Sequence, residues 1–401
     1  MRPEGGRPLR VAMIGTRGVP AAYGGFETAV EEIGRRMAAD GAEITVYCRT
    51  KKGADRPSSY EGMRLVHLPA LRSKTLETLS HTGLSVLHAV LRRRYDAAFV
   101  FNAANSPFVP LLRLARVPVA VHVDGLEWKR GKWGRVGRRY YRVAESLAVR
   151  WADALIADAQ GIADYYDREF GVDTTLLTYG SKAIDAAPDQ RLLDLGLQPG
   201  AYHLVVARFE PENHVDLIVD GYRRSSARLP LVVVGSAPYA AEHSRRIAAL
   251  ANGDERIRMV GGVWDQELLD QLYANALTYL HGHSVGGTNP SLLRAMGAAT
   301  AVIAYDVDFN REVAGPDARY FGDPGGVGES VEAAEINPES TKSAGSRLQE
   351  RALQRYDWGL VARGYTDLAV HLQEGHSSAG ARSRKRSSPV VQEVFSETTS
   401  A

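Results

Sequence analysis

Two rounds of short apolar segments alternating with helical segments predict an α/β protein of two doubly wound domains that face each other across a cleft. The first round occupies residues 1–198 and the second residues 199–350. The chain has 401 residues, enough for two such domains, and its 44% hydrophobic and 24% charged residues are typical of a globular protein. Its net charge of only +2 gives no indication of a nucleic-acid partner.

The first domain is predicted from apolar runs that read as parallel strands covered on both faces. We expect its strands at 9–14, 43–48, 63–68, 96–101, 117–123, 154–157 and 174–177. An amphipathic helix is expected over 28–39. The single cysteine, Cys48, lies in one of these strands, so we expect a small buried hydrophobic residue in a protein of a reducing compartment.

The pattern begins again after a turn-rich segment at 187–200. Strands are expected at 203–207, 231–235, 256–260, 276–280 and 300–305, with helices at 215–226, 239–251 and 266–274. We expect residues 351–375 to form a C-terminal helix that packs back on the first domain. Residues 376–401 are rich in Ser, Arg and Gly, so we expect a disordered tail rather than a basic anchor.

Two glycine-rich loops follow predicted strands, where open α/β sheets bind their ligands. The first contains Arg17, Gly24 and Gly25, and it lacks the Gly-x-Gly-x-x-Gly spacing of dinucleotide-binding oxidoreductases and epimerases. A purely structural loop is the alternative. The second loop, 286–291, begins a helix whose free N–H groups would bind an anion. Pro290 suits the first helical turn, and the expected donors are Gly287, Thr288, Asn289 and Ser291.

The motif Gly-Thr-Arg-Gly-Val-Pro-Ala-Ala-Tyr-Gly-Gly-Phe-Glu-Thr at 15–28 resembles the opening of bacterial GT-B glycosyltransferases of family 4, whose N-terminal region is a domain of unknown function. These proteins include rhamnosyltransferases of cell-surface polysaccharide assembly. The resemblance continues, in the same order, at 101–108, 123–133, 207–213, 263–265, 281–290 and 356–358. It implies a metal-independent hexosyltransferase that takes a hexose or deoxyhexose from a nucleotide diphosphate sugar, with no cofactor besides this donor substrate.

The same resemblance implies that Arg208 binds the donor diphosphate. It also exposes three departures, because Asn213 replaces a common lysine, and Gly286 and Arg294 replace two glutamates. An arginine cannot accept hydrogen bonds from ribose hydroxyls. One interpretation is that Arg294 supplies the cation lost at Asn213 and activity is retained. The other is a catalytically silent nucleotide-sugar-binding or scaffold protein.

Asp124 and Glu127 follow the predicted strand 117–123 and are the expected catalytic carboxylates. A carboxylate there would orient a sugar hydroxyl or take the proton of the acceptor, whereas a turn or helix cap is the structural alternative for Asp124. His283 flanks the second glycine-rich loop, and contact with the donor is weighed equally against a structural role. His281 and His283 have no partner cluster in the sequence, so no metal site is expected.

Residues 129–142 contain seven Lys or Arg and no acid, interleaved with Trp133, Tyr140 and Tyr141. Such a segment would attract anionic lipids near a polyprenyl-diphosphate-linked or other glycan acceptor; a solvated helix face and RNA binding are the alternatives. The sequence shows no run of 18 apolar residues and no signal peptide. We therefore expect a cytoplasmic protein, peripheral at the inner face of the plasma membrane, with no nucleic-acid partner.

Overall fold

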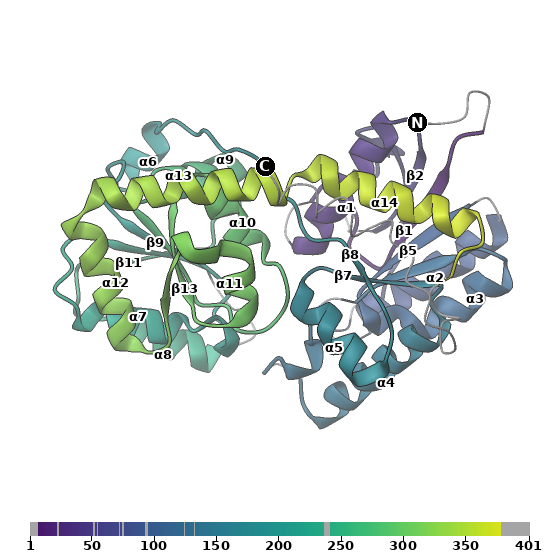
Figure 1. The fold of residues 1–401 in the computed structure, drawn as a ribbon, viewed down its shortest axis with the longest axis horizontal. Helices are drawn as coiled ribbons and strands as arrows, with labels where there is room; N and C mark the ends of the chain where they lie inside the picture. The colour runs from purple at the N-terminus through teal and green to yellow at the C-terminus, as the bar shows by residue number, and fades with distance from the viewer. Residues whose placement is uncertain are drawn as a thin grey trace.

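A computed structural model describes residues 7–21, 24–50, 53, 55–71, 73, 76–92, 95–123, 125–131, 133–235 and 241–377. They form two α/β domains side by side, each with a parallel sheet between layers of helices (Figure 1). The predicted pair of doubly wound domains is confirmed. No helix in the described ranges has both the length and the apolar character that crossing a bilayer requires.

The first domain has an eight-stranded sheet in the order β3-β4-β2-β1-β5-β6-β7-β8. Every pairing is parallel except that of β3 with β4. The strands are β1 (Arg10–Ile14), β2 (Glu43–Arg49), β3 (Ser59–Tyr60), β4 (Met63–Leu68), β5 (Ala97–Phe101), β6 (Val119–His122), β7 (Ala154–Ala157) and β8 (Thr175–Leu176). The helices are α1 (Gly25–Ala39), α2 (Glu77–Arg92), α3 (Val109–Leu114), α4 (Arg135–Trp151) and α5 (Gln160–Phe170), with short 3-10 turns at Ala103–Phe108 and Glu127–Lys129.

The second domain has a six-stranded, fully parallel sheet in the order β11-β10-β9-β12-β13-β14. Its strands are β9 (His203–Val206), β10 (Leu231–Val234), β11 (Ile257–Gly261), β12 (Thr278–His281), β13 (Ala301–Tyr305) and β14 (Arg319–Phe321). Helix α6 (Gln190–Asp194) precedes this sheet. The helices that follow are α7 (Val215–Arg224), α8 (Ala241–Ala251), α9 (Gln266–Ala274), α10 (Pro290–Gly297), α11 (Asp308–Ala314), α12 (Pro324–Ile336) and α13 (Pro338–Arg355), with 3-10 turns at Pro211–Asn213 and Gly315–Asp317.

Alternate residues of β1 show how the first sheet separates two cores. Val11 and Met13 pack in one apolar cluster with α1, whereas Ala12 and Ile14 pack in another that includes residues of α2, α3, α4 and α5. This alternation follows from the two-residue period of a strand. Helices α2 to α5 therefore cover one face of the sheet, and α1 covers the opposite face.

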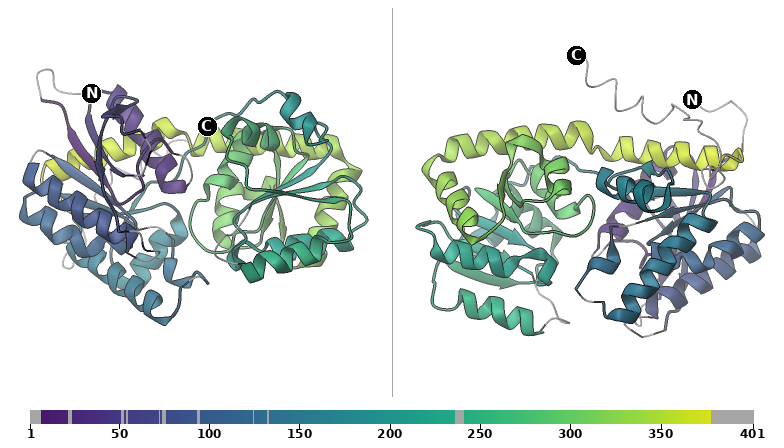
Figure 2. Two further views of the ribbon diagram at one scale, coloured as in Figure 1. Left: turned by 180° about the vertical axis from the view of Figure 1, so that it is seen from behind. Right: turned by 60° about the horizontal axis from the view of Figure 1, so that its bottom comes forward.

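The C-terminal segment forms two helices rather than one. Helix α13 lies on the second domain, the chain turns at Tyr356 and Asp357, and α14 (Trp358–Gln373) continues across the first domain (Figure 2). Helix α14 packs beside α1, and Tyr365 meets Phe99 of β5 with ring centroids 5.0 Å apart. Helix α14, the last helix in the described residues, thus completes the core of the first domain. The tail expected to be disordered lies outside the described residues from 378 onward.

Candidate functional site

The carboxyl ends of the two sheets meet between the domains at three close approaches. A Cβ placed on Gly125, just after β6, would lie 2.4 Å from Cα of Gly286 in the loop after β12. A Cβ on Gly25 would lie 3.1 Å from Cγ of Pro290. The third approach is a hydrogen bond from Thr288 Oγ1 to the carbonyl of Asp158, which follows β7. Backbone from both domains therefore encloses the loop 286–291.

The loop 286–291 leads into α10 and retains several free donors. Asn289 caps the helix, since its Oδ1 accepts from the N–H of Ser291 (2.9 Å) and from Ser291 Oγ (2.7 Å). Within the described ranges, the N–H groups of Gly287, Thr288 and Asn289 make no hydrogen bond to the protein. Three of the four expected phosphate donors are thus available, whereas the N–H of Ser291 is already used by the cap.

A second helix N-terminus faces the first. Gly24 caps α1 with φ of 117°, and a side chain there would meet Oε2 of Glu27 at 2.1 Å. Glu27 Oε1 accepts from the N–H of Arg17 (2.9 Å), which holds the loop in place while the Arg17 side chain stays exposed. Because Gly25 abuts Pro290, the positive ends of α1 and α10 converge on one place, which favours an anion. The structure brings Gly24 and Gly25 to the glycine-rich loop of the second domain.

Arg208, Asn213 and His283 form the floor of this site in the second domain. Arg208 follows β9, and its guanidinium lies 3.4 Å from Glu210. Asn213 donates through Nδ2 to the carbonyl of Arg208 (2.7 Å), and its Oδ1 lies 2.6 Å from His283 Nδ1. An amide oxygen only accepts, so Nδ1 of His283 carries the proton and Nε2 is left as an acceptor. Asn213, at a position where the resemblance implies a lysine, therefore carries no charge and instead holds the imidazole ring of His283 in place.

His283 is held in its neutral form. Burial, followed by the nearby His281 and the charges of Arg130 and Arg208, lowers its pKa well below the ordinary value. Its Nε2 lies 3.1 Å from the Cβ position of Gly286, so the acceptor nitrogen points toward the glycine-rich loop. Burial also lowers the pKa of His281 to about 3. Among the described residues, no group of three or more His, Cys, Asp or Glu is placed to hold a metal ion.

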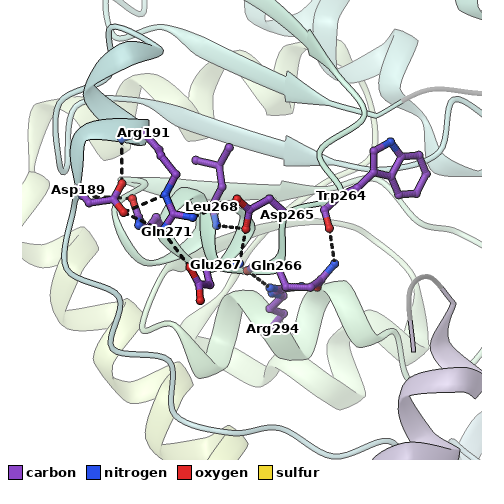
Figure 3. A network of polar contacts seen from close by, with 9 residues as sticks. All are labelled: Asp189, Arg191, Trp264, Asp265, Gln266, Glu267, Leu268, Gln271 and Arg294. Carbon is purple, nitrogen blue, oxygen red and sulfur yellow. Dashed lines mark hydrogen bonds and ion pairs between the residues drawn. The ribbon is translucent and has the colours of Figure 1, made fainter. Parts of the chain in front are cut away.

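The side chain of Arg294 is engaged by residues of α9. Its Nε donates to Asp270 Oδ1 (2.8 Å), and its two terminal nitrogens donate to the side chain and the carbonyl of Gln266 (both 2.9 Å). The guanidinium also lies over the ring of Tyr273, 5.6 Å from its centre. Figure 3 shows this side chain among polar residues of α9 and its preceding loop. Arg294 therefore ties α10 to α9, and its guanidinium is engaged by Asp270 and Gln266.

Of the two expected catalytic carboxylates, the structure describes only Glu127. Asp124 lies outside the described residues. Glu127 is buried, with Oε1 2.7 Å from Arg130 Nε and Oε2 accepting from Trp133 Nε1 at 3.2 Å. A carboxylate engaged on both oxygens is poorly placed to take a proton from an acceptor. Glu127 instead positions Arg130.

Arg130 and Glu212 are site residues that the sequence reasoning missed. A Cβ on Gly131 would lie 3.6 Å from Glu212 Oε2, so the segment around Arg130 rests on the second domain. Arg130 and Arg208 come from opposite domains and both act electrostatically on His283. The carboxylate of Glu212 is buried, and neither oxygen has a hydrogen-bond partner in the described chain. The only sequence signal for Arg130 was its membership of the basic run 129–142.

Two protein families match consecutive parts of this chain. Residues 24–179 match the family described as glycosyl transferase 4-like domain, and residues 198–349 match glycosyl transferases group 1. No curated protein matches the sequence.

Solved structures share the whole fold. Sucrose-phosphate synthase from Thermosynechococcus elongatus has a TM-score of 0.78 at 20% identity, covering 92% of this chain and 100% of that one. Anabaena HepE, solved in complex with UDP-glucose, has a TM-score of 0.71 at 17% identity, covering 90% and 99%. A glycosyltransferase from Rickettsia africae has a TM-score of 0.68 at 9% identity, covering 91% and 98%.

Proposed function

We propose that this chain, which belongs to the glycosyltransferases of the GT-B fold, moves a hexose or deoxyhexose from a nucleotide diphosphate sugar to a surface glycan. The proposal includes rhamnose as a donor sugar, no metal ion in the reaction and no cofactor besides the donor. UDP-glucose, which HepE was solved with, is a natural first donor to test.

The proposal rests on one observation. The N-termini of α1 and α10 meet at the domain interface, where Arg208 and Arg130 also lie. Transfer begins when an acceptor hydroxyl attacks the anomeric carbon and the bond to the diphosphate oxygen breaks. Negative charge then grows on the leaving diphosphate. The N–H groups of Gly287 and Thr288, together with Arg208 and Arg130, would meet that charge. Fixed donors and cations aimed at developing charge are the usual source of such rate enhancement.

His283 fits the donor sugar better than the diphosphate. Its neutral ring presents Nε2 as an acceptor toward the loop 286–291, so it would receive a hydrogen bond from a sugar hydroxyl. Asp124 remains our proposed group for orienting a hydroxyl or taking the acceptor proton. In the sequence it stands between Val123, the residue after β6, and Gly125, which contacts Gly286.

The acceptor is proposed to be a growing cell-surface polysaccharide or a polyprenyl-diphosphate-linked glycan. The basis is the basic segment 129–142, which continues directly from Arg130 at the site into the exposed arginines of α4. A diphosphate-linked acceptor is an anion and would be attracted to that approach. Reaction at the inner face of the plasma membrane follows from this class of acceptor.

A nucleotide-sugar-binding protein without transfer activity is the second candidate. It is favoured by the loss of both carboxylates at Gly286 and Arg294, because Arg294 is committed to Asp270 and replaces neither. The deciding experiment incubates the purified protein with a panel of nucleotide sugars and a lipid-linked acceptor, and detects products by mass spectrometry. Calorimetry with the matching nucleoside diphosphates runs in parallel. Binding without product supports the silent protein, and neither binding nor product overturns both candidates.

A further inference from the structure

Three neighbouring helices of the first domain present apolar side chains to solvent. Helices α2, α3 and α4 lie next to one another over the same face of the sheet (Figure 1). Each carries outward apolar residues at helical spacing, namely Leu84 (41% exposed), Leu87 (52%), Leu91 (75%), Leu111 (46%), Leu114 (83%), Val136 (85%) and Val143 (50%). Outward apolar stripes on three adjacent helices are unusual for a monomer surrounded by water and indicate a binding surface.

The same helices are strongly basic. Residues 77–151, from the start of α2 to the end of α4, contain 13 Lys or Arg but only five Asp or Glu. Three of those acids are buried, namely Asp96, which pairs with Arg7 and Arg10, Glu127 and Glu145. The other two are Asp124 and Glu77, an exposed residue at the start of α2 that pairs with Arg49. The exposed basic residues of α2 to α4 and their ends include Arg92, Arg113, Arg116, Arg135, Arg138, Arg139, Arg142 and Arg150. In the described part of 77–151, Glu77 is the one exposed acid, and it already pairs with Arg49.

We propose that this surface, made by the exposed residues of α2, α3 and α4 and here called the three-helix surface, docks on an anionic lipid bilayer. The leucines and valines enter the boundary between headgroups and acyl chains, and the arginines contact lipid phosphates. Apolar side chains bordered by basic ones are the composition that interfacial helices use. Lipid phosphates complement the excess of arginine, and the acyl boundary takes up the apolar stripes. RNA would satisfy only the charge, because the stripes would stay in water.

The place where the described chain ends agrees with this surface. Ser377 Oγ donates to the carbonyl of Asp153, whose side chain pairs with Arg113 of α3. The chain therefore leaves the structure beside the three-helix surface. The sequence that follows contains Arg382, Arg384, Lys385 and Arg386. These residues add positive charge to a segment that begins at the proposed contact with the bilayer.

Docking in this way would bring the site close to the lipid. Arg130 precedes the start of α4 by only five residues, so the bilayer-bound face continues toward the site. An acceptor anchored in the membrane would reach the site with little extraction from the bilayer. This consequence rests on the proposed transfer reaction, whereas bilayer binding itself does not.

Vesicle sedimentation of the full-length protein tests the proposal. Vesicles of phosphatidylcholine with phosphatidylglycerol are compared with phosphatidylcholine alone. We expect the wild type to sediment with the anionic vesicles and the triple variant Leu87→Ser, Leu91→Ser, Leu114→Ser to lose binding by about tenfold or more. Arg139→Glu with Arg142→Glu should lose binding to a similar extent. Matched controls on the second domain are Ile336→Ser, where the side chain is 83% exposed like that of Leu114, and Arg319→Glu, also at an exposed position.

Each outcome has one meaning. The proposal is supported if only the variants on the three-helix surface lose binding to anionic vesicles while their circular dichroism and thermal unfolding stay unchanged. Equal loss in the control variants, no binding of the wild type to anionic vesicles, or binding to single-stranded RNA in place of vesicles would overturn it. Transfer of sugar to a soluble acceptor is measured on the same preparations. Vesicle binding without any transfer would reject the proposed enzyme activity and leave the docking surface standing.

Discussion

Gly125 is the position at which the contact between the two domains can be tested most directly. Its Cβ position is 2.4 Å from Cα of Gly286, 2.9 Å from its carbonyl carbon and 3.1 Å from the nitrogen of Gly287. All three atoms are backbone and cannot rotate away. Ordinary contact begins at 3.4 Å, so the Gly125→Ala variant must separate the two loops by about 1 Å.

That displacement predicts a specific loss of activity. A shift of about 1 Å in reacting groups costs about 100-fold in rate, or about 2.7 kcal/mol of activation free energy. The backbone of Gly125 does not require glycine, since its φ is not in the left-handed region, so the first domain should fold normally. The nucleoside diphosphate is proposed to rest mainly on the second domain. Its affinity should therefore change much less than the rate.

Steady-state transfer rates and calorimetric affinities of Gly125→Ala should be compared with those of Gly322→Ala. The added methyl group at Gly322 has nothing within 4 Å, so this control should behave like the wild type. Thermal unfolding of both variants checks their folding. If Gly125→Ala transfers sugar at the wild-type rate, the contact between Gly125 and Gly286 is not part of the active arrangement, and our account of the site is wrong.

Three further perturbations test single residues. Arg208→Ala should lower kcat about 100-fold or more, because a cation at the leaving diphosphate is lost. If Arg130 meets the same charge, the loss of activation free energy in the double variant Arg208→Ala, Arg130→Ala should differ from the sum of the losses in the two single variants, all measured in steady-state assays. Arg294→Ala should lower the free energy of unfolding by about 1–3 kcal/mol in urea titrations, because it separates α10 from α9. The affinity of this variant for a nucleoside diphosphate, measured by calorimetry, should stay within about threefold of the wild type. A larger loss would show that Arg294 contributes to nucleotide binding. Burial raises the pKa of Glu145 from 4.5 to about 7. Between these two pH values the folded state keeps a proton that the unfolded state releases. The free energy of unfolding should therefore fall by roughly 3 kcal/mol as the pH rises from 4.5 to 7. Glu145→Gln should remove this fall, and an unchanged pH dependence of its urea midpoint would contradict the assignment.

The sequence was a good guide to the sheets because buried parallel strands are almost continuously apolar. Predicted strands at 43–48 and 231–235 correspond to β2 and β10 within one residue at either end. Two short edge strands were missed, because β3 and β14 have only two and three residues, too few to show a pattern, whereas the two-residue β8 was expected at 174–177. Helix α13, with a largely polar sequence, was not expected as an element separate from α14.

Side-chain partners were much harder to predict than backbone elements. The glycine-rich loop was placed correctly after β12 because its residues are contiguous in the sequence. Arg294 was assigned to the diphosphate, but its position on α10 directs it to α9, where Asp270 and Gln266 are its partners. Arg130 reaches the site only because two domains meet there. Such contacts join residues far apart in the chain, and local patterns carry no information about them.

The path of the last helix has a consequence for protein synthesis. Tyr365 is buried against Phe99, so the core of the first domain includes residues made after the whole second domain. The first domain therefore cannot complete its core on the ribosome while the second is still being translated. A chain terminated before Trp358 would leave β5 and α1 without the helix that covers them. Loss of the segment from Trp358 onward would thus damage the opposite end of the sequence first, and a nascent chain would need protection until α14 emerges.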